Sequence, residues 1–421
     1  MTYGKGDSME RVLLMAVHHQ TQTLERFQSS LDELEALTKT AGGEVAGIVT
    51  QKRERLHPGT YFGSGKLEEL AELVEQEEPL LVISNDELSP GQLKNISNRV
   101  GVRVIDRSQL ILDIFATRAH TREGKLQVEL AQMQYLLPRL YGQGTEMSRL
   151  GAGIGTRGPG ETKLETDRRH IRRRIDEIKQ QLKAVVSHRS RYRERRKVNQ
   201  AFQIALVGYT NAGKSTIFNR VTGNDSLEQD QLFATLDPMT RRMRLPSGFQ
   251  ALLTDTVGFI QDLPTALIAA FRSTLEEVTE ADFIIHMVNS AHPDHEQQQA
   301  TVLKLLSELG ADQLPILTVY NKADLLTEDF IASAHPYVQI SAFKEEDRRL
   351  VMDKVQEMIQ EASEFYDTIV PASGGRLLDK LAQETILTKR EYNEEMDAYE
   401  VSGYVLPDHP LFHQLKGKNE A

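Results

Sequence analysis

The first 120 residues alternate short apolar runs with amphipathic stretches. The apolar runs are VLLMAV, EVAGIV, PLLVIS and VRVID, and helical patterns lie at 23–40, after Lys66, after Ser89-Pro90 and from Ser108. Strands that alternate with helices are typical of a parallel sheet with helices packed on its faces. The pattern therefore predicts an N-terminal α/β domain over residues 1–120.

The apolar spacing changes over residues 121–199 to that of two long helices. One series is Leu126, Leu130, Met133, Leu137 and Leu140, and the other is Ile171, Ile175, Ile178, Leu182 and Val185. Matched stripes of this kind favour an antiparallel helical hairpin over two separate core helices. The joining segment, residues 141–163, is rich in glycine, and we expect it to be a long tip loop that is either functional or merely a flexible linker.

A second alternation of strands and helices covers residues 200–365 and begins with the strand FQIALVG. It predicts a doubly wound α/β domain. Beyond it, the runs TIV and YEVSGYVL flank the helical stretch RLLDKLAQETI, which predicts a small C-terminal α+β domain over residues 366–421.

Composition and charge narrow the class of protein. The chain has no cysteine, which excludes a disulfide framework, a thiolate metal site and a catalytic thiol. No apolar stretch approaches the roughly 20 residues that span a bilayer, and no cleavage site follows the apolar run at 12–17, so we expect a soluble cytoplasmic protein.

The charge is unevenly distributed. Residues 165–198 hold 13 Lys/Arg and 5 Asp/Glu, a balance of +8, so the remaining residues sum to −19 within the total of −11. Such a run is often only a solvated helix face, but beside a glycine-rich tip it predicts a basic hairpin that reaches into RNA. The candidate RNA contacts are Arg149, Arg157, Lys163, Arg168, Arg169, Arg172 and Arg173.

The strongest motif is GYTNAGKST, which follows the strand FQIALVG and matches the P-loop of nucleotide-binding proteins. Its amides and the helix after it are expected to hold the β-phosphate. Lys214 is expected to bridge the β- and γ-phosphates and Ser215 to hold Mg²⁺. The predicted phosphate-binding residues are Gly208, Tyr209, Thr210, Asn211, Ala212, Gly213, Lys214, Ser215 and Thr216.

A second glycine-rich stretch, FGSGKLEEL at 62–70, fails the same pattern. Thr60 stands where the first glycine is required, and Leu67 replaces the hydroxyl residue. We expect a tight turn before a helix that starts at Leu67, and it stays open whether Lys66 and the backbone amides of this turn bind an anion such as RNA phosphate or ATP.

Two further motifs indicate the base and the γ-phosphate. Asn321-Lys322-Ala323-Asp324 ends a strand, and the Asp324 carboxylate can accept from guanine N1–H and the 2-amino group, a donor pair that adenine lacks. Ser341-Ala342 is expected to lie behind the guanine. Asp255 is expected to orient the Mg²⁺ water shell, and Gly258 to bring its amide to the γ-phosphate.

Between these motifs lies Phe233-Ala234-Thr235, which is expected to bind GTP, with Thr235 closing over Mg²⁺ as a third metal-binding residue. The four motifs in this order predict a GTPase in which Lys214, Thr235, Gly258 and Asn211 act in catalysis. A P-loop kinase or metabolic ATPase is the competing class, and Asp324 opposes it.

One expected catalytic group is missing. Phe259 occupies the position where Ras-like enzymes carry a glutamine that orients the attacking water. Either a partner reshapes the site, or another group acts there. We hypothesise that Asn211 helps to bind K⁺; equal GTP turnover in potassium and sodium buffers, with the activating partner present, would contradict this.

The residues together resemble a known family. The stretches DIFATRAHTREGKLQVELAQMQYLLPRL, GIGTRGPGETKLETDRR, GYTNAGKST, FATLDPMTR and DTVGFI are similar to those of the HflX-type GTPases of the translation-factor-related class. The resemblance implies a monomer that binds the large ribosomal subunit, with the hairpin tip at ribosomal RNA near the peptidyl transferase centre. It also implies GTP-gated dissociation of stalled or idle ribosomes, and hydrolysis stimulated by the ribosome.

Other functions stay open at this stage. They are an NTPase that remodels ribosomal RNA or acts in ribosome assembly, powered by the N-terminal domain, and a GTPase of transfer-RNA modification or membrane traffic. The sequence shows neither a second catalytic domain nor a lipid anchor for the last of these.

Overall fold

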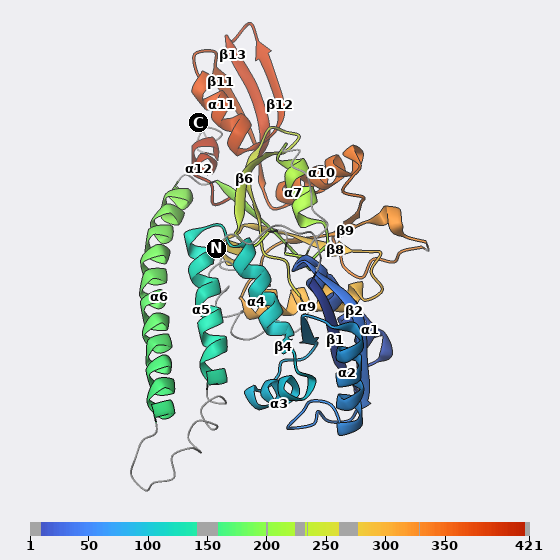
Figure 1. Ribbon diagram of the computed structural model, residues 1–421. Coiled ribbons are helices and arrows are strands. Elements are labelled where there is room, and N and C mark those ends of the chain that lie inside the picture. The colour runs from blue at the N-terminus through green and yellow to red at the C-terminus, as the bar shows by residue number, and fades with distance from the viewer. Residues whose placement is uncertain are drawn as a thin grey trace. The chain divides into compact units, whose positions relative to one another are not determined.

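The computed structural model describes residues 10–140, 159–198, 201–223, 232–233, 235–260, 277–327 and 329–416, and in helix α6 the side chains of residues 165–185. The chain divides into two compact units. The first comprises Met1–Ser187, Gln231–Asp237 and Ile260–Arg272, and the second His188–Asp230, Pro238–Phe259 and Ser273–Ala421. Figure 1 labels the helices and strands of both.

The first unit contains a four-stranded parallel sheet with strand order β2-β1-β3-β4. Its elements are β1 Glu10–His19, α1 Leu24–Thr40, β2 Gly43–Arg53, α2 Ser64–Glu77, β3 Leu81–Ser84, α3 Pro90–Val100, β4 Arg103–Asp106 and α4 Arg107–Arg118. Strand β1 is buried on both faces: Leu13 packs in the cluster with α2 and α3, and Ala16 packs with Phe27 of α1. A parallel strand between two helical layers requires this continuous apolar run, and the predicted N-terminal α/β fold is confirmed.

The FGSGK stretch forms the start of α2. The helix begins at Ser64, so the predicted start at Leu67 is wrong by three residues. Ser64 and Gly65 stand in the first turn, where the backbone amides have no acceptor within the helix. Leu67 and Leu70, which follow, are buried. The Lys66 ammonium lies 2.7 Å from Glu69 Oε1, one turn along the helix.

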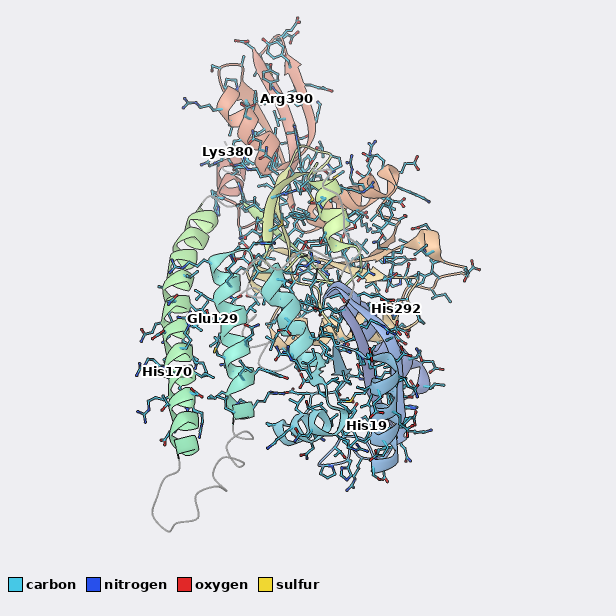
Figure 2. The ribbon with its side chains drawn as sticks, viewed as in Figure 1. His19, Glu129, His170, His292, Lys380 and Arg390 are labelled. Atoms are coloured by element: carbon cyan, nitrogen blue, oxygen red, sulfur yellow. The ribbon has the colours of Figure 1, made fainter. Side chains whose placement is uncertain are left out.

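Helices α5 (Arg122–Arg139) and α6 (Pro159–Val198) form the predicted antiparallel pair (Figure 1). Their stripes meet in one apolar cluster, made by Leu126, Leu130, Met133 and Leu137 with Ile171, Ile175, Ile178 and Leu182. Arg174 of α6 also binds both carboxylate oxygens of Glu129, which Figure 2 labels on α5, at 2.7 and 3.0 Å.

The predicted tip loop at 141–163 extends too far, because α6 already begins at Pro159. Proline is favoured in the first helical turn, since its fixed φ suits the helix and its missing N–H has no intrahelical acceptor there. The rest of the predicted loop, residues 141–158, lies outside the described residues.

The second unit contains a six-stranded sheet with order β10-β9-β8-β5-β7-β6, parallel except for β6. Its elements are β5 Phe202–Gly208, α7 Lys214–Val221, β6 Met239–Arg244, β7 Gln250–Asp255, β8 Phe283–Asn289, α9 His295–Glu308, β9 Ile316–Asn321, the 3₁₀ turn η3 Ala323–Leu325, β10 Tyr337–Gln339 and α10 Glu345–Glu361.

The apolar side chains of this sheet separate into two layers. Leu206 of β5 packs with Phe218 of α7 and Val355 of α10, whereas Val207 belongs to the cluster that holds Val302 and Leu306 of α9. Helices therefore cover both faces, and the predicted doubly wound fold is confirmed.

The last elements form a separate antiparallel sheet with order β11-β13-β12. They are β11 Glu364–Pro371, α11 Gly375–Glu384, β12 Ile386–Asn393, β13 Ala398–Val405 and α12 Pro410–Lys416. Tyr366, Val370, Leu381 and Val401 share one apolar cluster, which confirms the predicted α+β fold. Across the described chain, no helix combines the length and the apolar character needed to cross a membrane.

Candidate nucleotide site

The predicted phosphate loop joins β5 to α7 in the second unit. Gly208 has φ +154°, and a Cβ there would lie 2.3 Å from the Met287 carbonyl oxygen. Gly213 has φ +91°, and a Cβ there would lie 2.1 Å from Asn321 Nδ2. Only glycine fits at either position, because a side chain would collide with atoms of the neighbouring strands β8 and β9.

Lys214 points its ammonium group into this loop. The side chain is buried, and Nζ donates to the carbonyl oxygens of Gly208 at 3.0 Å and Tyr209 at 2.8 Å. Burial lowers the pKa of Lys214 to about 8, while the nearby Asp255 carboxylate acts in the opposite direction. A phosphate bound in the loop would favour the charged form of Lys214 and offset the effect of burial on its pKa.

The predicted metal residues Ser215 and Asp255 are brought together. The Ser215 hydroxyl donates to Asp255 Oδ2 at 3.1 Å, and Asp255 is 1 % exposed at the end of β7. Gly258 lies close to the Lys214 ammonium group: a Cβ at Gly258 would be 3.0 Å from Lys214 Nζ. A hydroxyl and a carboxylate are the oxygen donors that Mg²⁺ prefers, so the residues present fit the metal. Thr216 follows in the first turn of α7.

Asn321 joins the phosphate loop to the predicted base-binding segment. Its side chain is buried, with Nδ2 donating to the Ala212 carbonyl at 2.9 Å and Oδ1 accepting from the Ala342 amide at 2.9 Å. Ser290 holds the Asn321 carbonyl with its amide and its hydroxyl. The sequence predicted only a base-binding role for Asn321, and this bridge was missed because its partners are more than 100 and about 20 residues away.

The remaining base-binding residues surround this bridge. Lys322 has φ +65°, and its Nζ donates to Asn211 Oδ1 at 3.2 Å. Asp324 is exposed in η3, where a base can reach it. The Ser341 amide donates to Asp347 Oδ2 at 2.6 Å, which fixes the turn before Ala342.

Phe259 is a core residue and not a member of the site. Its ring is 3 % exposed and lies in the apolar cluster with Val207, Tyr209 and Val278. Its backbone braces the phosphate loop: the amide donates to the Gly208 carbonyl at 3.1 Å, and the carbonyl accepts from Thr210 at 2.7 Å. The position that carries a glutamine in Ras-like enzymes is thus used for packing.

The other predicted residues belong to the first unit or lie outside the described residues. Phe233 and Thr235 belong to the first unit, whereas Ser215 and Asp255 belong to the second, and Ala234 lies outside the described residues. Arg169, Arg172 and Arg173 are exposed on α6, and Arg168 is half-buried there. Arg149, Arg157 and the Lys163 side chain lie outside the described residues.

His286 is a polar residue that the sequence analysis missed. It lies on β8 between Val207 of β5 and Thr318 of β9, is 1 % exposed, and within the described chain neither ring nitrogen has a hydrogen-bond partner. Burial, followed by the positive charge of Lys214, lowers the pKa of His286 to about 3. The sequence of β8 is FIIHMVN, in which His286 is flanked by apolar residues, but the burial of its ring depends on the neighbouring strands of the sheet.

This burial makes a stability prediction. Below its ordinary pKa of 6.5 the unfolded chain protonates His286 while the folded chain keeps it neutral until about pH 3, so stability falls as the pH falls through this window. Between pH 7 and pH 5 the loss is roughly 2 kcal/mol. Urea denaturation at both pH values should show this loss in the wild type. In His286→Leu, the decrease in the free energy of unfolding between pH 7 and pH 5 should be smaller by the same amount. The same pH dependence in both proteins would contradict the assignment.

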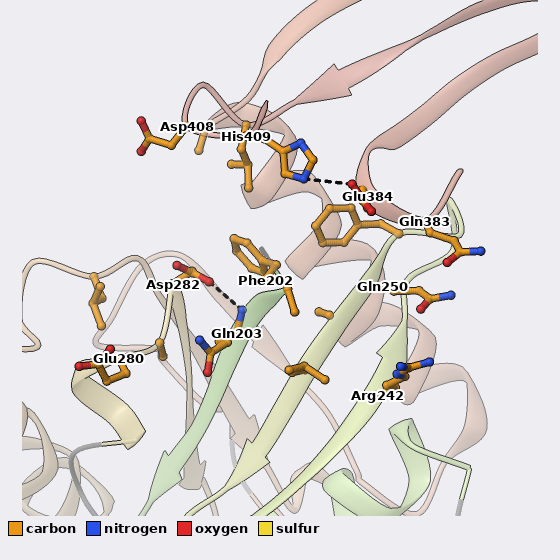
Figure 3. Close-up of a pocket in the computed structure, with 18 of the residues that line it drawn as sticks. Phe202, Gln203, Arg242, Gln250, Glu280, Asp282, Gln383, Glu384, Asp408 and His409 are labelled. Carbon is orange, nitrogen blue, oxygen red and sulfur yellow. Dashed lines mark hydrogen bonds and ion pairs between the residues drawn. The ribbon is translucent and has the colours of Figure 1, made fainter. Parts of the chain in front are cut away.

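A separate cavity of about 1000 Å³ lies at the amino ends of strands β5 and β7 of the six-stranded sheet (Figure 3). Phe202, Gln203 and Gln250 line it at the start of β5 and β7, with Glu384 and His409 opposite. Asp282 Oδ2 accepts from the Gln203 amide at 2.7 Å, and His409 lies 3.4 Å from Glu384. The nucleotide motifs lie at the carboxyl ends of these strands, so the cavity is not part of their site.

Comparison with known proteins agrees with this assembly. Residues 28–116 match the family model of the GTP-binding GTPase N-terminal region, residues 118–196 that of the GTP-binding GTPase middle region, and residues 203–322 that of the 50S ribosome-binding GTPase. A solved GTP-binding protein from Sulfolobus solfataricus in complex with GDP is 24% identical, with a TM-score of 0.46 over 84% of this chain and 99% of that chain. That likeness is too weak to add to the assignment.

Two curated relatives decide the family. GTPase HflX of Alkalihalophilus pseudofirmus is 54% identical over 413 residues, which cover 98% of this chain and 97% of the relative. GTPase HflX of Escherichia coli is 43% identical over 328 residues, 78% of this chain and 76% of the relative. Identity of 54% over nearly the whole length of the first relative shows the family: the chain belongs to the GTPase HflX family and is a GTPase.

Proposed function

We propose that the chain binds the large ribosomal subunit in its GTP form, dissociates stalled or idle ribosomes, and leaves after a ribosome-stimulated hydrolysis of GTP. The observation that carries the proposal is the match of residues 203–322, which contain the assembled phosphate loop, to the family described as a 50S ribosome-binding GTPase. The exposed arginines of α6 support an RNA partner, because they offer cations on one helix to phosphates.

The site residues take the following roles in this proposal. Lys214 bridges the β- and γ-phosphates, Ser215 and Asp255 with Thr235 hold Mg²⁺, and the Gly258 amide senses the γ-phosphate. When bound, Mg²⁺ would neutralise the negative charge that develops on the phosphate oxygens. Asp324, Ser341 and Ala342 recognise guanine, with Asn321 and Lys322 positioning them. The K⁺ role of Asn211 stays a hypothesis.

The packing of Phe259 supports activation by a partner. Its ring faces the core, so it leaves the orientation of the attacking water to another group. An enzyme of this kind hydrolyses GTP slowly until a partner supplies that group, which fits stimulation by the ribosome. The division into domains at 1–120, 121–199, 200–365 and 366–421, the monomeric state and the cytoplasmic location are further parts of the proposal.

The alternative is an NTPase that remodels ribosomal RNA with ATP bound at the N-terminal domain. It requires an anion site at the FGSGK stretch. In the folded chain Lys66 is paired with Glu69 there, and no observation favours a second nucleotide.

Sucrose-gradient sedimentation of intact ribosomes with a non-hydrolysable GTP analogue tests the proposal. We expect the wild type to split ribosomes and a deletion of residues 144–160 to fail. Splitting by both proteins would exclude a role of the hairpin tip in dissociating the ribosome. Splitting by neither would favour a GTPase of transfer-RNA modification or membrane traffic.

The exposed arginines provide a finer version of this test. The triple variant Arg169→Gln, Arg172→Gln and Arg173→Gln should weaken binding to the large subunit and lower the slope of log affinity against log salt by up to about three, since each lost phosphate contact removes roughly one. Arg174→Gln is the control on the same helix: it removes one positive charge, against three in the triple variant, from a guanidinium already bound to Glu129, and should leave the salt slope nearly unchanged. Equal salt slopes in both variants would count against direct RNA contacts.

A further inference from the structure

The carboxylate of Asp237 binds the beginning of helix α5, the first helix of the hairpin. Asp237 Oδ2 accepts from the amides of His120 at 2.9 Å and Thr121 at 2.8 Å, and Oδ1 accepts from the Thr121 hydroxyl at 2.5 Å. Thr121 is the N-cap of α5, and its hydroxyl oxygen in turn accepts from the Gly124 amide at 2.9 Å. All three residues belong to the same compact unit as Asp237.

An anion at this position is favourable for a physical reason. The first amides of a helix have no intrahelical acceptor, and the helix dipole is positive at this end. Asp237 therefore supplies acceptors and charge to α5 from a segment 116 residues away in sequence.

Gly124 is shaped to this contact. A Cβ at Gly124 would lie 2.3 Å from Asp237 Oδ1 and 3.1 Å from Thr121 Oγ1, so any side chain would displace the carboxylate. Glycine is a poor helix former, and in the first turn of α5 its benefit is the room that it leaves for Asp237.

The residues before Asp237 are anchored in the same unit. Phe233 is 2 % exposed at φ +56°, and its ring meets that of Phe115 of α4 edge to face with centroids 4.5 Å apart. The Leu232 amide donates to Thr40 Oγ1 of α1 at 3.3 Å. We call Leu232, Phe233 and Thr235–Asp237 the docked segment.

The docked segment also carries a residue predicted to sense nucleotide. In sequence it lies between the phosphate loop and Asp255, and Thr235 is the residue expected to close over Mg²⁺. One short segment thus contains both Thr235, for which a role at Mg²⁺ is predicted, and Asp237, which binds the cap of α5 two residues later.

We propose that Asp237 is the link by which the nucleotide state controls the start of the hairpin. When the segment around Thr235 rearranges with GTP and Mg²⁺, the carboxylate changes its hold on His120 and Thr121, and the first turn of α5 gains or loses its cap. Coupling of this kind is reciprocal, so the state of α5 also changes the relative affinity for GTP and GDP. The inference rests on the proposed ordering of Thr235 by nucleotide.

Hydrogen exchange of the full-length protein with GDP and with a non-hydrolysable GTP analogue tests the link. In the wild type the amides of His120 and Thr121 should exchange at rates that differ between the two nucleotides by about tenfold, the factor for roughly one net hydrogen bond. Asp237→Asn should abolish that difference, because the asparagine side chain has one acceptor oxygen where Asp237 has two, and it carries no negative charge at the start of the helix. A difference that persists in Asp237→Asn would overturn the proposal.

Two further variants separate the link from the stability of the helix. Gly124→Ala improves helix propensity but pushes the carboxylate away, so it should also abolish the nucleotide dependence while α5 stays folded. Glu123→Gln removes a carboxylate from the same first turn without touching Asp237, so this variant should keep the nucleotide dependence of exchange. If Gly124→Ala behaves like the wild type, the link is refuted.

The same data distinguish failure of the link from failure of GTP gating. If exchange around Leu232 and Phe233 responds to nucleotide but that of His120 and Thr121 does not, only the link is wrong. If neither responds, the proposed ordering of the segment by GTP is wrong as well.

Discussion

Asp324→Asn is expected to change the base preference of the enzyme from guanine to xanthine by roughly 10⁴-fold in the ratio of the two kcat/KM values, the scale of discrimination that a paired polar group provides. The Asp324 carboxylate is exposed in η3 and can accept from guanine N1–H and the 2-amino group. An asparagine amide would set its own N–H against the 2-amino group of guanine, but it can donate to the 2-oxo group of xanthine.

The backbone around Asp324 makes this substitution a local one. The Ala323 amide donates to the Ile340 carbonyl at 3.0 Å, and Lys322 holds its positive φ beside the buried Asn321. The turn is therefore fixed by backbone contacts that the new side chain leaves intact.

The measurement is steady-state hydrolysis of GTP and XTP by both proteins under the same conditions. Asp324→Ala is the matched control, because it should lose GTP without gaining XTP. Unchanged GTP turnover in Asp324→Asn would mean that another residue reads the base.

Much of this site could be predicted from sequence because the signals are local. The strand FQIALVG, the glycines at 208 and 213, and Lys214-Ser215 lie in one continuous stretch with the spacing of a phosphate loop, and both glycines have a positive φ within that stretch. The signal for α3 is equally local: its capping box of Ser89 and Gln92 follows the general rule and appears in the structure.

The contacts that were missed join residues far apart in the chain. Asn321 reaches Ala212 across 109 residues, and Asp237 reaches Thr121 across 116. Hydrophobic periodicity shows which face of a strand is buried, but not which carbonyl or amide another loop brings to it. Phe259 illustrates the same limit: sequence reasoning noted a missing glutamine, whereas the structure gives the phenyl ring a place in the core.

Asn321→Ala is expected to cost the protein stability and nucleotide affinity together. The change leaves the Ala212 carbonyl and the Ala342 amide without the partner that each has at 2.9 Å in a buried site. An unsatisfied buried group costs about 1–3 kcal/mol, so a loss of roughly 2–4 kcal/mol in the free energy of unfolding is expected. Because Ala212 belongs to the phosphate loop and Ala342 to the base segment, GDP affinity should fall by about 100-fold, equivalent to roughly 2.7 kcal/mol.

Asn289→Ala separates this bridge from a general effect of removing an amide at the sheet edge. Asn289 lies directly opposite Asn321 at the end of β8. Within the described residues, the Asn289 side chain makes only a local contact, in which Oδ1 accepts from the Ala291 amide at 3.2 Å. Urea denaturation and titration with a fluorescent GDP derivative should show a small loss for Asn289→Ala and a large one for Asn321→Ala. Equal losses would mean that the bridge between the two segments does not hold the site together. A loss of affinity without a loss of stability would instead assign Asn321 to the base alone.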